Sequence, residues 1–209
     1  MSDRLSRWAV ILLIAACAWP TGVPLAAGVG NATGAPVARA SRCDSAIRID
    51  GVLDEPCWAT ASPLTSFTQR LPAEGAPATQ ATQVRVLFDA ENLYIGADLL
   101  DSDPGKIIAL EMKEDGALNN DDLFGILLDT FHDRRNAFYF EVNPNGARAD
   151  ALLYDEGRVQ SWDWDGVWEA RGRIGGRGWT VEMQIPFKTL HFDPGRTSPW
   201  APNCWPRCV

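Results

Sequence analysis

Histidine is scarce in this sequence, with two among 209 residues, and several catalytic patterns are missing altogether. No GxSxG, HExxH or phosphate-loop motif is present, which excludes the common hydrolase, zinc-protease and nucleotide-binding signatures. No CxxC pair marks a zinc site. A basic surplus is also missing: the formal net charge is −8, which excludes a nucleic-acid partner. We therefore expect no enzyme and a neutral ligand.

A long helical stripe is absent as well, and short segments of alternating apolar and polar residues take its place. Turns rich in Gly, Pro or Asn separate these segments, as Asn143–Gly146 does. The predicted strands are 84–88, 93–99, 122–129, 138–142, 149–154, 164–173 and 179–185, and a helical turn is expected at 54–61. The pattern predicts an all-β fold, an antiparallel β-sandwich of the jelly-roll type.

The N-terminus has the order of a secretory signal. Arg4 and Arg7 precede the apolar run Trp8–Trp19, and small residues follow. The run is too short to span a bilayer comfortably. We predict a signal peptide at 1–27 and an exported protein. Ile14–Cys17 also resembles a lipobox, so a lipoprotein anchored through Cys17 is the alternative.

Composition divides the rest of the chain. Residues 28–42 are expected to be a linker, 43–193 the sandwich and 194–209 an irregular tail, with a truncated or frame-shifted end as a hypothesis. Export permits disulfides, and Cys43 with Cys57 is one candidate pair. Spacing alone leaves the pairing open, because Cys204 and Cys208 are also present.

Three segments resemble a known family: 47–58 (IRIDGVLDEPCW), 119–145 (NNDDLFGILLDTFHDRRNAFYFEVNPN) and 178–192 (GWTVEMQIPFKTLHF). Together they are similar to the carbohydrate-binding module family 9-like domain, part of the DOMON-like β-sandwich group. The resemblance implies a glycan or oligosaccharide ligand, a role in carbohydrate catabolism, and no catalytic nucleophile. In Gram-negative relatives the module precedes an outer-membrane β-barrel, which implies a periplasmic or outer-membrane location.

Nine tryptophans provide flat apolar faces of the kind that sugars stack on. The densest group, within 154–168, has acidic residues between its aromatic rings. Trp162 and Trp164 would form a platform if they shared one strand face; otherwise they cover the sandwich end. Sugar-binding relatives carry a Trp just before the position of Asp122, and none stands there in this sequence. The candidate carbohydrate-binding residues are Tyr154, Trp162, Trp164, Trp168, Asn119, Asn120 and Asp121.

Family modules can also hold calcium, which prefers carboxylate oxygens. Asp122 and Asp129 are the candidate ligands for Ca2+, although no EF-hand spacing is present. Three alternative functions stay open. The first is a plug or docking module of an outer-membrane barrel protein, and the second is an accessory module of a glycoside hydrolase. The third is a haem-binding domain, for which Met112, Met183, His132 and His191 are the available axial-ligand types.

Overall fold

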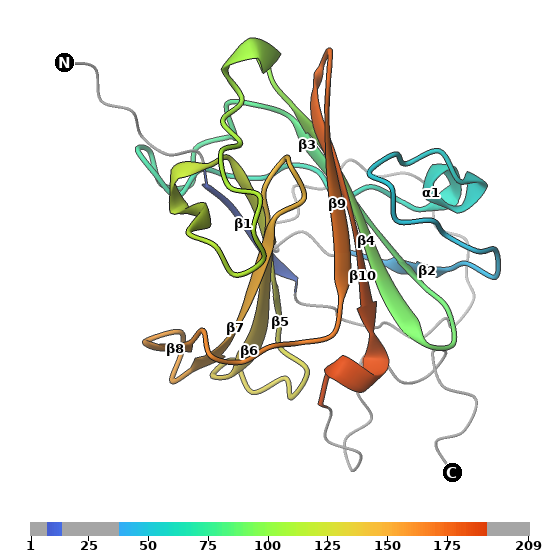
Figure 1. Cartoon of the computed structure of the whole chain (residues 1–209), viewed down its shortest axis with the longest axis vertical. Coiled ribbons are helices and arrows are strands. Elements are labelled where there is room, and N and C mark those ends of the chain that lie inside the picture. The colour runs from blue at the N-terminus through green and yellow to red at the C-terminus, as the bar shows by residue number, and fades with distance from the viewer. Residues whose placement is uncertain (1–7, 14–37, 192–209) are drawn as a thin grey trace, which may run out of the picture.

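Two β-sheets pack face to face in the computed structural model, which describes residues 8–13 and 38–191 (Figure 1). Sheet A has the strand order β1-β5-β6-β7-β8, and sheet B has the order β2-β3-β4-β10-β9. Sheet A consists of β1 (Trp8–Leu13), β5 (Leu123–Leu128), β6 (Ala137–Val142), β7 (Arg148–Tyr154) and β8 (Val159–Ser161). Sheet B consists of β2 (Ala40–Arg42), β3 (Thr82–Phe88), β4 (Asn92–Leu100), β9 (Glu169–Gly175) and β10 (Gly178–Pro186). The predicted β-sandwich is confirmed.

Pairing within the sheets is antiparallel except at two edges. β1 runs parallel to β5, and β2 runs parallel to β3. The helical elements are α1 (Pro56–Thr60) and the 3-10 turns η1 (Pro104–Lys106), η2 (Leu118–Asn120) and η3 (Phe187–Thr189). Within the described residues, no helix is long and apolar enough to cross a membrane.

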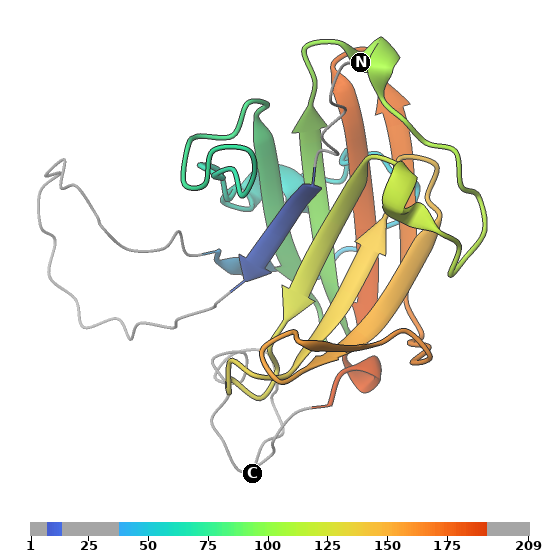
Figure 2. The ribbon, with the colours of Figure 1, turned by 90° about the vertical axis from the view of Figure 1, so that its left-hand side faces the viewer.

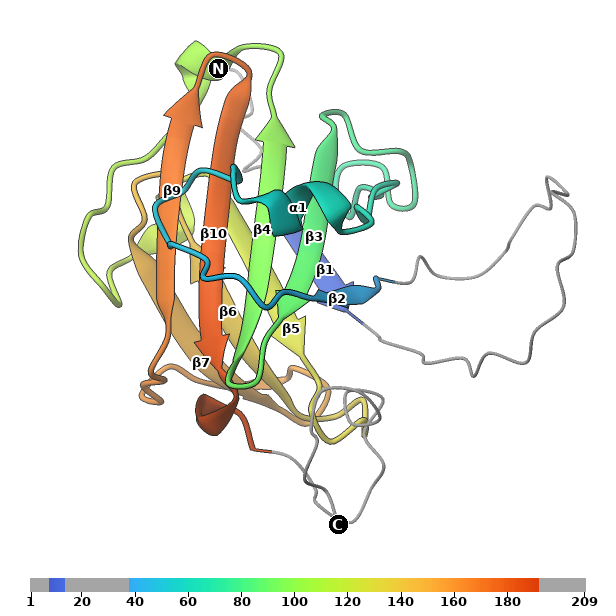
Figure 3. The same ribbon diagram turned by 90° about the vertical axis from the view of Figure 1, so that its right-hand side faces the viewer.

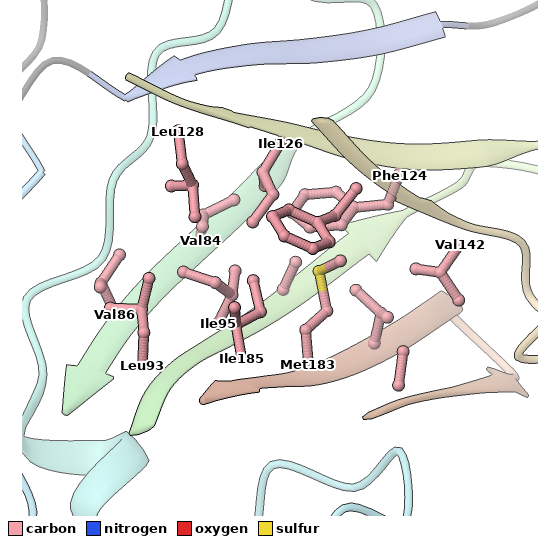
Figure 4. Close-up of a cluster of buried hydrophobic side chains, with 14 of the residues drawn as sticks. Val84, Val86, Leu93, Ile95, Phe124, Ile126, Leu128, Val142, Met183 and Ile185 are labelled. Carbon is pink, nitrogen blue, oxygen red and sulfur yellow. The ribbon is translucent and has the colours of Figure 1, made fainter. Parts of the chain in front are cut away.

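The core lies between the two sheets and is built by strand alternation (Figure 4). Every second side chain of a strand points to the same face, so each sheet contributes one apolar layer. Phe124 and Ile126 of sheet A face Ile95 and Met183 of sheet B, and all four are fully buried. Burial of side chains of this size stabilises the fold by about 1.5–3 kcal/mol each.

The outer face of sheet B is crossed by the segment 43–61, which contains α1 (Figure 3). Trp58 lies over Gly96, where a Cβ atom would stand only 2.8 Å from the indole ring. A disulfide links Cys43 and Cys57 within this segment. The candidate pair from the sequence is therefore present. Glu182 of β10 accepts hydrogen bonds from the Trp58 indole and from the backbone N–H of Gly51. The segment therefore covers the middle of this face, while Glu169, Arg171 and Arg173 of β9 stay exposed.

The outer face of sheet A is covered at one end only. The segment from β4 to β5 crosses the end where β5 begins, as Figure 2 shows. Asn143, which is fully buried, fastens this segment by donating to the Glu111 carbonyl at 2.8 Å and to the Asp121 carboxylate at 2.7 Å. The opposite end of the same face, toward β8, carries exposed side chains. That end of sheet A therefore has an open outer surface.

Some boundaries differ from the prediction. The expected strand at 164–173 begins only at Glu169, because 164–168 bridge from sheet A to sheet B, and the short strand β8 was not predicted. β2 falls within the predicted linker and β1 within the predicted signal peptide. Residues 192–209, which include the predicted tail and two cysteines, lie outside the described residues. The signal peptide and the domain limits stay predictions.

Candidate functional site

Strand alternation places a small group of side chains on the open part of sheet A. Phe138 and Phe140 of β6 point into the core, so Tyr139 and Glu141 point outward. Ala137 of β6 pairs with Leu153 of β7, and Leu153 pairs with Gln160 of β8, so Gln160 points to the same outer face as Tyr139. Trp162, two residues after Gln160, points to that face as well. The site therefore comes from β6, β8 and the residue that follows β8.

These side chains contact one another. The rings of Tyr139 and Trp162 meet edge-to-face, with centroids 6.0 Å apart and an interplanar angle of 88°. The Tyr139 hydroxyl donates to the Glu141 carboxylate at 2.7 Å. The Trp162 indole N–H donates to the Gln160 side-chain oxygen at 3.3 Å. We call Trp162, Tyr139, Glu141 and Gln160 the Trp162 cluster.

Burial sets the protonation of this cluster. Glu141 is only 7% exposed, and desolvation raises the pKa of its carboxyl above the ordinary value. The Tyr139 hydroxyl opposes part of that rise by donating to the carboxyl. Burial also raises the pKa of the Tyr139 phenol, and the Glu141 charge adds to the effect. Tyr139 therefore keeps its proton and remains a donor to Glu141 at neutral pH.

Trp162 is the accessible member of the cluster. It is 48% exposed, while Tyr139 is half-buried and Glu141 lies beneath. An edge-to-face contact orients the indole without covering both of its faces. The Gln160 amide oxygen contacts the indole N–H, and Asp163, the next residue in the sequence, is exposed. The arrangement presents a fixed aromatic face with polar groups at its border.

The structure separates Trp162 from the two neighbouring tryptophans. The Trp164 ring packs on Phe138 and Phe140, with centroids 5.1 Å and 5.9 Å away, on the core side of sheet A. The expected platform of Trp162 and Trp164 on one face is therefore not formed. Trp168 is 2% exposed and donates to the Asp150 carboxylate at 2.9 Å. Its ring is part of the core and has no free face for a sugar.

The other predicted residues lie apart from Trp162. Tyr154 is exposed, but it pairs with Val159, the residue before Gln160. Its side chain therefore points to the opposite face of the sheet from Gln160. Asn119 and Asn120 are exposed on η2, near the start of β5, at the far end of sheet A from β8. Asp121 is buried and accepts from the backbone N–H groups of Leu110 and Glu111, both at 3.0 Å. Its carboxylate holds the crossing segment.

The two predicted calcium ligands do not converge. Asp122 precedes β5 and Asp129 follows it, so about 23 Å of extended strand separates them. Asp122 accepts from the Ile108 N–H at 2.8 Å, and Asp129 accepts from the Arg134 N–H at 2.8 Å. Within 8–13 and 38–191, no three His, Cys, Asp or Glu side chains gather so that they could hold a metal ion. Asp122 and Asp129 therefore do not share one site, and a calcium-binding role for either carboxylate stays a prediction.

The haem alternative has its residues in unrelated places. Met183 is fully buried in the core, and Met112 is among the most exposed apolar side chains. His132 lies in the turn between β5 and β6, and His191 stacks on Phe138 with centroids 6.3 Å apart. In the described chain, no hydrogen bond or ring contact joins any two of these four residues.

Three members of the cluster were not singled out from the sequence. Tyr139 and Glu141 were visible as the polar half of an alternating strand, but nothing local showed which part of the outer face stays open. Gln160 belongs to a strand of three residues, too short for a period-two pattern to be recognised. The useful signal is Gly125, whose missing side chain leaves space that the Tyr139 ring fills.

Comparisons with known proteins agree with this architecture. A family model described as "Carbohydrate family 9 binding domain-like" matches residues 49–199. Among curated proteins, none matches the sequence. A family 9 carbohydrate-binding module from Caldicellulosiruptor kristjanssonii in complex with glucose is similar in structure, with 15% identity and a TM-score of 0.50. The similarity covers 74% of this chain and 72% of that chain.

Two further structures are similar. A candidate carbohydrate-binding protein from Bacteroides uniformis ATCC 8492 has 12% identity and a TM-score of 0.53, covering 73% of this chain and 72% of that chain. The Caldicellulosiruptor kristjanssonii module in complex with cellotriose has 16% identity and a TM-score of 0.49. It covers 70% of this chain, which spans 66% of that protein's length.

Proposed function

Because the chain belongs to the carbohydrate family 9 binding domain-like family, we propose that it binds a neutral oligosaccharide against Trp162. The observation that carries the proposal is the exposed, oriented Trp162 indole on the open end of sheet A. Sugars bind aromatic rings through their apolar C–H faces, and neighbouring polar groups read their hydroxyls. Gln160, which contacts the indole, and Asp163, the next residue in the sequence, are the candidates for this role.

The charge of the chain supports a neutral ligand. A net charge of −8 opposes the approach of uronic acids or sulfated sugars. Trp162 is also flanked in sequence by Asp163, and Asp165 follows two residues later, so the local charge has the same sign. The module complexes with glucose and cellotriose make gluco-oligosaccharides the first ligands to test.

We infer that binding proceeds without hydrolysis. Hydrolysis of a glycoside needs two carboxyl groups that face the scissile bond. The buried carboxylates here are engaged elsewhere: Asp121 and Asp150 bind backbone N–H groups, and Glu182 also holds the Trp58 indole. Glu141 lies under Tyr139. A role in carbohydrate catabolism would then be to retain a polysaccharide for other proteins.

Export is part of the proposal. The Cys43–Cys57 disulfide supports an oxidising compartment, where such bonds persist. We propose removal of residues 1–27, or lipidation at Cys17, and a periplasmic or outer-membrane location. Mass spectrometry of the N-terminus of the protein isolated from cells decides among these. An intact Met1 in the isolated protein would overturn both processing routes.

Isothermal titration with soluble gluco- and xylo-oligosaccharides tests the sugar site. We expect binding by the wild type and a loss of about 2 kcal/mol, roughly 30-fold in Kd, for Trp162→Ala. Ile174→Ala is the matched control, because Ile174 is 46% exposed but lies on β9 of the other sheet. No binding to any neutral glycan, or equal binding by Trp162→Ala, contradicts the proposal.

A further inference from the structure

Glu141 differs in its hydrogen bonds from the other buried carboxyl groups of the described chain. Asp121, Asp150 and Glu182 each accept hydrogen bonds at both carboxyl oxygens. Glu141 accepts one bond, from the Tyr139 hydroxyl to Oε2, and its Oε1 has no partner among the described residues. Burial and the Tyr139 hydroxyl are what shift its pKa, with no contribution from a cation. A carboxyl group in this state destabilises the fold, so stability does not account for it.

The free oxygen of Glu141 touches solvent. Among the described residues that are not exposed, the only fully buried side-chain nitrogen or oxygen atom without a hydrogen bond is Nε of Arg148. Oε1 of Glu141 also lacks a hydrogen bond, so it is not fully buried, and the remaining 7% exposure of the residue agrees with this. Its cross-strand neighbours, Gly125 of β5 and Ala149 of β7, have no polar side-chain atom that could bind it. Oε1 is therefore an open hydrogen-bonding position on the outer face of sheet A.

Strand register places Glu141 one row from Trp162 on this face. Extending the register of β8 by one residue puts Trp162 opposite Ala151, and Ala151 pairs with Tyr139. Trp162 and Tyr139 thus share a row, and Glu141 occupies the next row of β6. With strands about 4.8 Å apart and rows about 7 Å apart, the backbones of Trp162 and Glu141 are separated by roughly 12 Å. Tyr139 bridges this interval, because its ring meets the indole and its hydroxyl binds Glu141.

We propose that Oε1 of Glu141 is a second contact of the sugar site and binds a hydroxyl group of the sugar unit next to the one on Trp162. The inference rests on the proposed sugar binding by Trp162 and adds the ligand class: a chain of two or more linked sugar units that crosses Tyr139. A sugar hydroxyl both donates and accepts, so it satisfies Oε1 in either protonation state of the carboxyl group. Because Tyr139 already holds the desolvated carboxyl group in place, the bond forms with little loss of conformational freedom.

The two contacts make different demands on the ligand. Stacking on the indole needs only the apolar face of a sugar, which one ring provides. The bond to Oε1 needs a hydroxyl group on the far side of Tyr139, and a second linked ring supplies it. Monosaccharides therefore use the indole alone. Dependence of affinity on chain length is the measurable signature of Glu141.

Calorimetric titration with glucose, cellobiose and cellotriose tests the second contact. We expect the wild type to bind the two longer sugars roughly tenfold or more tighter than glucose, because a hydrogen bond to a carboxyl group adds about that factor. Glu141→Leu removes both oxygens at similar size and should abolish the difference by weakening cellobiose and cellotriose only. Unchanged glucose affinity shows that Trp162 keeps its place. Glu169→Leu, which removes an exposed carboxylate from β9 of the other sheet, is the matched control and should change none of the three affinities.

Glu141→Gln keeps the shape of the side chain and replaces Glu141→Leu if that variant does not fold. An amide forms a weaker bond than a carboxylate, so cellotriose affinity should fall by roughly threefold or more while glucose affinity stays. Equal losses for glucose and cellotriose overturn the inference, because Glu141 would then act only through Trp162. Wild-type affinity for cellotriose no higher than for glucose also overturns it.

One outcome separates this inference from the proposed function. If Trp162→Ala weakens cellotriose binding and the Glu141 variants do not, the second contact is wrong and the sugar site on the indole stands. A wild type that binds no glycan of any length overturns both.

Discussion

The phenol of Tyr139 lies over Gly125 of the neighbouring strand, and a Cβ atom at residue 125 would stand 2.8 Å from the Tyr139 hydroxyl oxygen. The contact explains why a glycine occupies the middle of an otherwise apolar strand. It allows the tyrosine to lie flat enough to reach Glu141 and to meet Trp162 at its edge.

Gly125→Ala should therefore weaken sugar binding without touching the sugar. The methyl group displaces the Tyr139 ring, and Trp162 loses its support. We expect a loss of about 1 kcal/mol, roughly fivefold in Kd, measured by titration. Gly176→Ala in the turn between β9 and β10 is the control, because a Cβ atom there meets nothing within 4 Å. Unchanged affinity in Gly125→Ala would show that Tyr139 does not support Trp162.

Glu141→Gln should change how stability depends on pH. Burial raises the pKa of the Glu141 carboxyl in the folded protein. The folded state therefore binds the proton more tightly, and this contribution to stability is lost as pH rises from about 4.3, the ordinary value, through the folded pKa. Glutamine removes the titration, so the variant should gain stability relative to wild type as pH rises. Thermal melts across that range measure it.

Glu111→Gln serves as the control of opposite sign. Backbone N–H groups of Lys113 and Met112 lower the pKa of the Glu111 carboxyl. Its contribution to stability is present above the ordinary pKa and disappears as pH falls, so the Gln variant should lose stability relative to wild type as pH rises. The same slope for Glu141→Gln and Glu111→Gln would contradict the assignment of Glu141 as a desolvated carboxyl.

Asn143→Asp should be at least as destabilising as Asn143→Ala at neutral pH. The alanine variant removes the donor to the Asp121 carboxylate and the Glu111 carbonyl, and it takes from the buried Ala147 N–H its acceptor, which together cost about 3 kcal/mol. An aspartate would instead direct a carboxylate at the Glu111 carbonyl and at the Asp121 carboxylate. Urea denaturation measures both. Asn145→Ala, exposed in the same turn, should cost less than about 1 kcal/mol; a mild effect of Asn143→Asp would contradict this hydrogen-bond assignment.

The double variant Cys43→Ala, Cys57→Ala should unfold at a lower denaturant concentration. The disulfide closes a loop with a sequence separation of 14, for which the chain-entropy model gives about 3 kcal/mol. Reducing agent added to the wild type should produce a similar shift, while leaving the double variant unchanged. Equal midpoints for oxidised and reduced wild type would show that the bond contributes nothing to stability.

The fold was largely predictable because it follows from local alternation. Trp179 and Ile185 lie on one face of the predicted strand 179–185, and both are buried. The hairpin of β3 and β4 and the turn at Asn143 were also predicted, since turn residues and period-two patterns are local signals. β2 escaped prediction because three residues cannot display a period.

The site was predictable only in part, because exposure depends on contacts between distant residues. Asp121 is buried through Asn143, 22 positions away, and Trp168 through Asp150, 18 positions away. Trp162 and Trp164 look equivalent in sequence, yet β8 ends at Ser161 and the chain then turns, which sends their rings to opposite faces. Composition identifies an aromatic segment but cannot tell which ring will be accessible.

The segment 43–61 packs on the outer face of sheet B, whereas Trp162 lies on the outer face of sheet A, so the two broad faces of the molecule differ. A tether or fluorescent label attached at Ser62, an exposed residue just after this segment, would leave the Trp162 indole facing solution. Surface-immobilised protein oriented in this way should retain access to insoluble polysaccharide, whereas attachment through residues beside β8 should block it. The same asymmetry would let a cell display the module in one productive orientation.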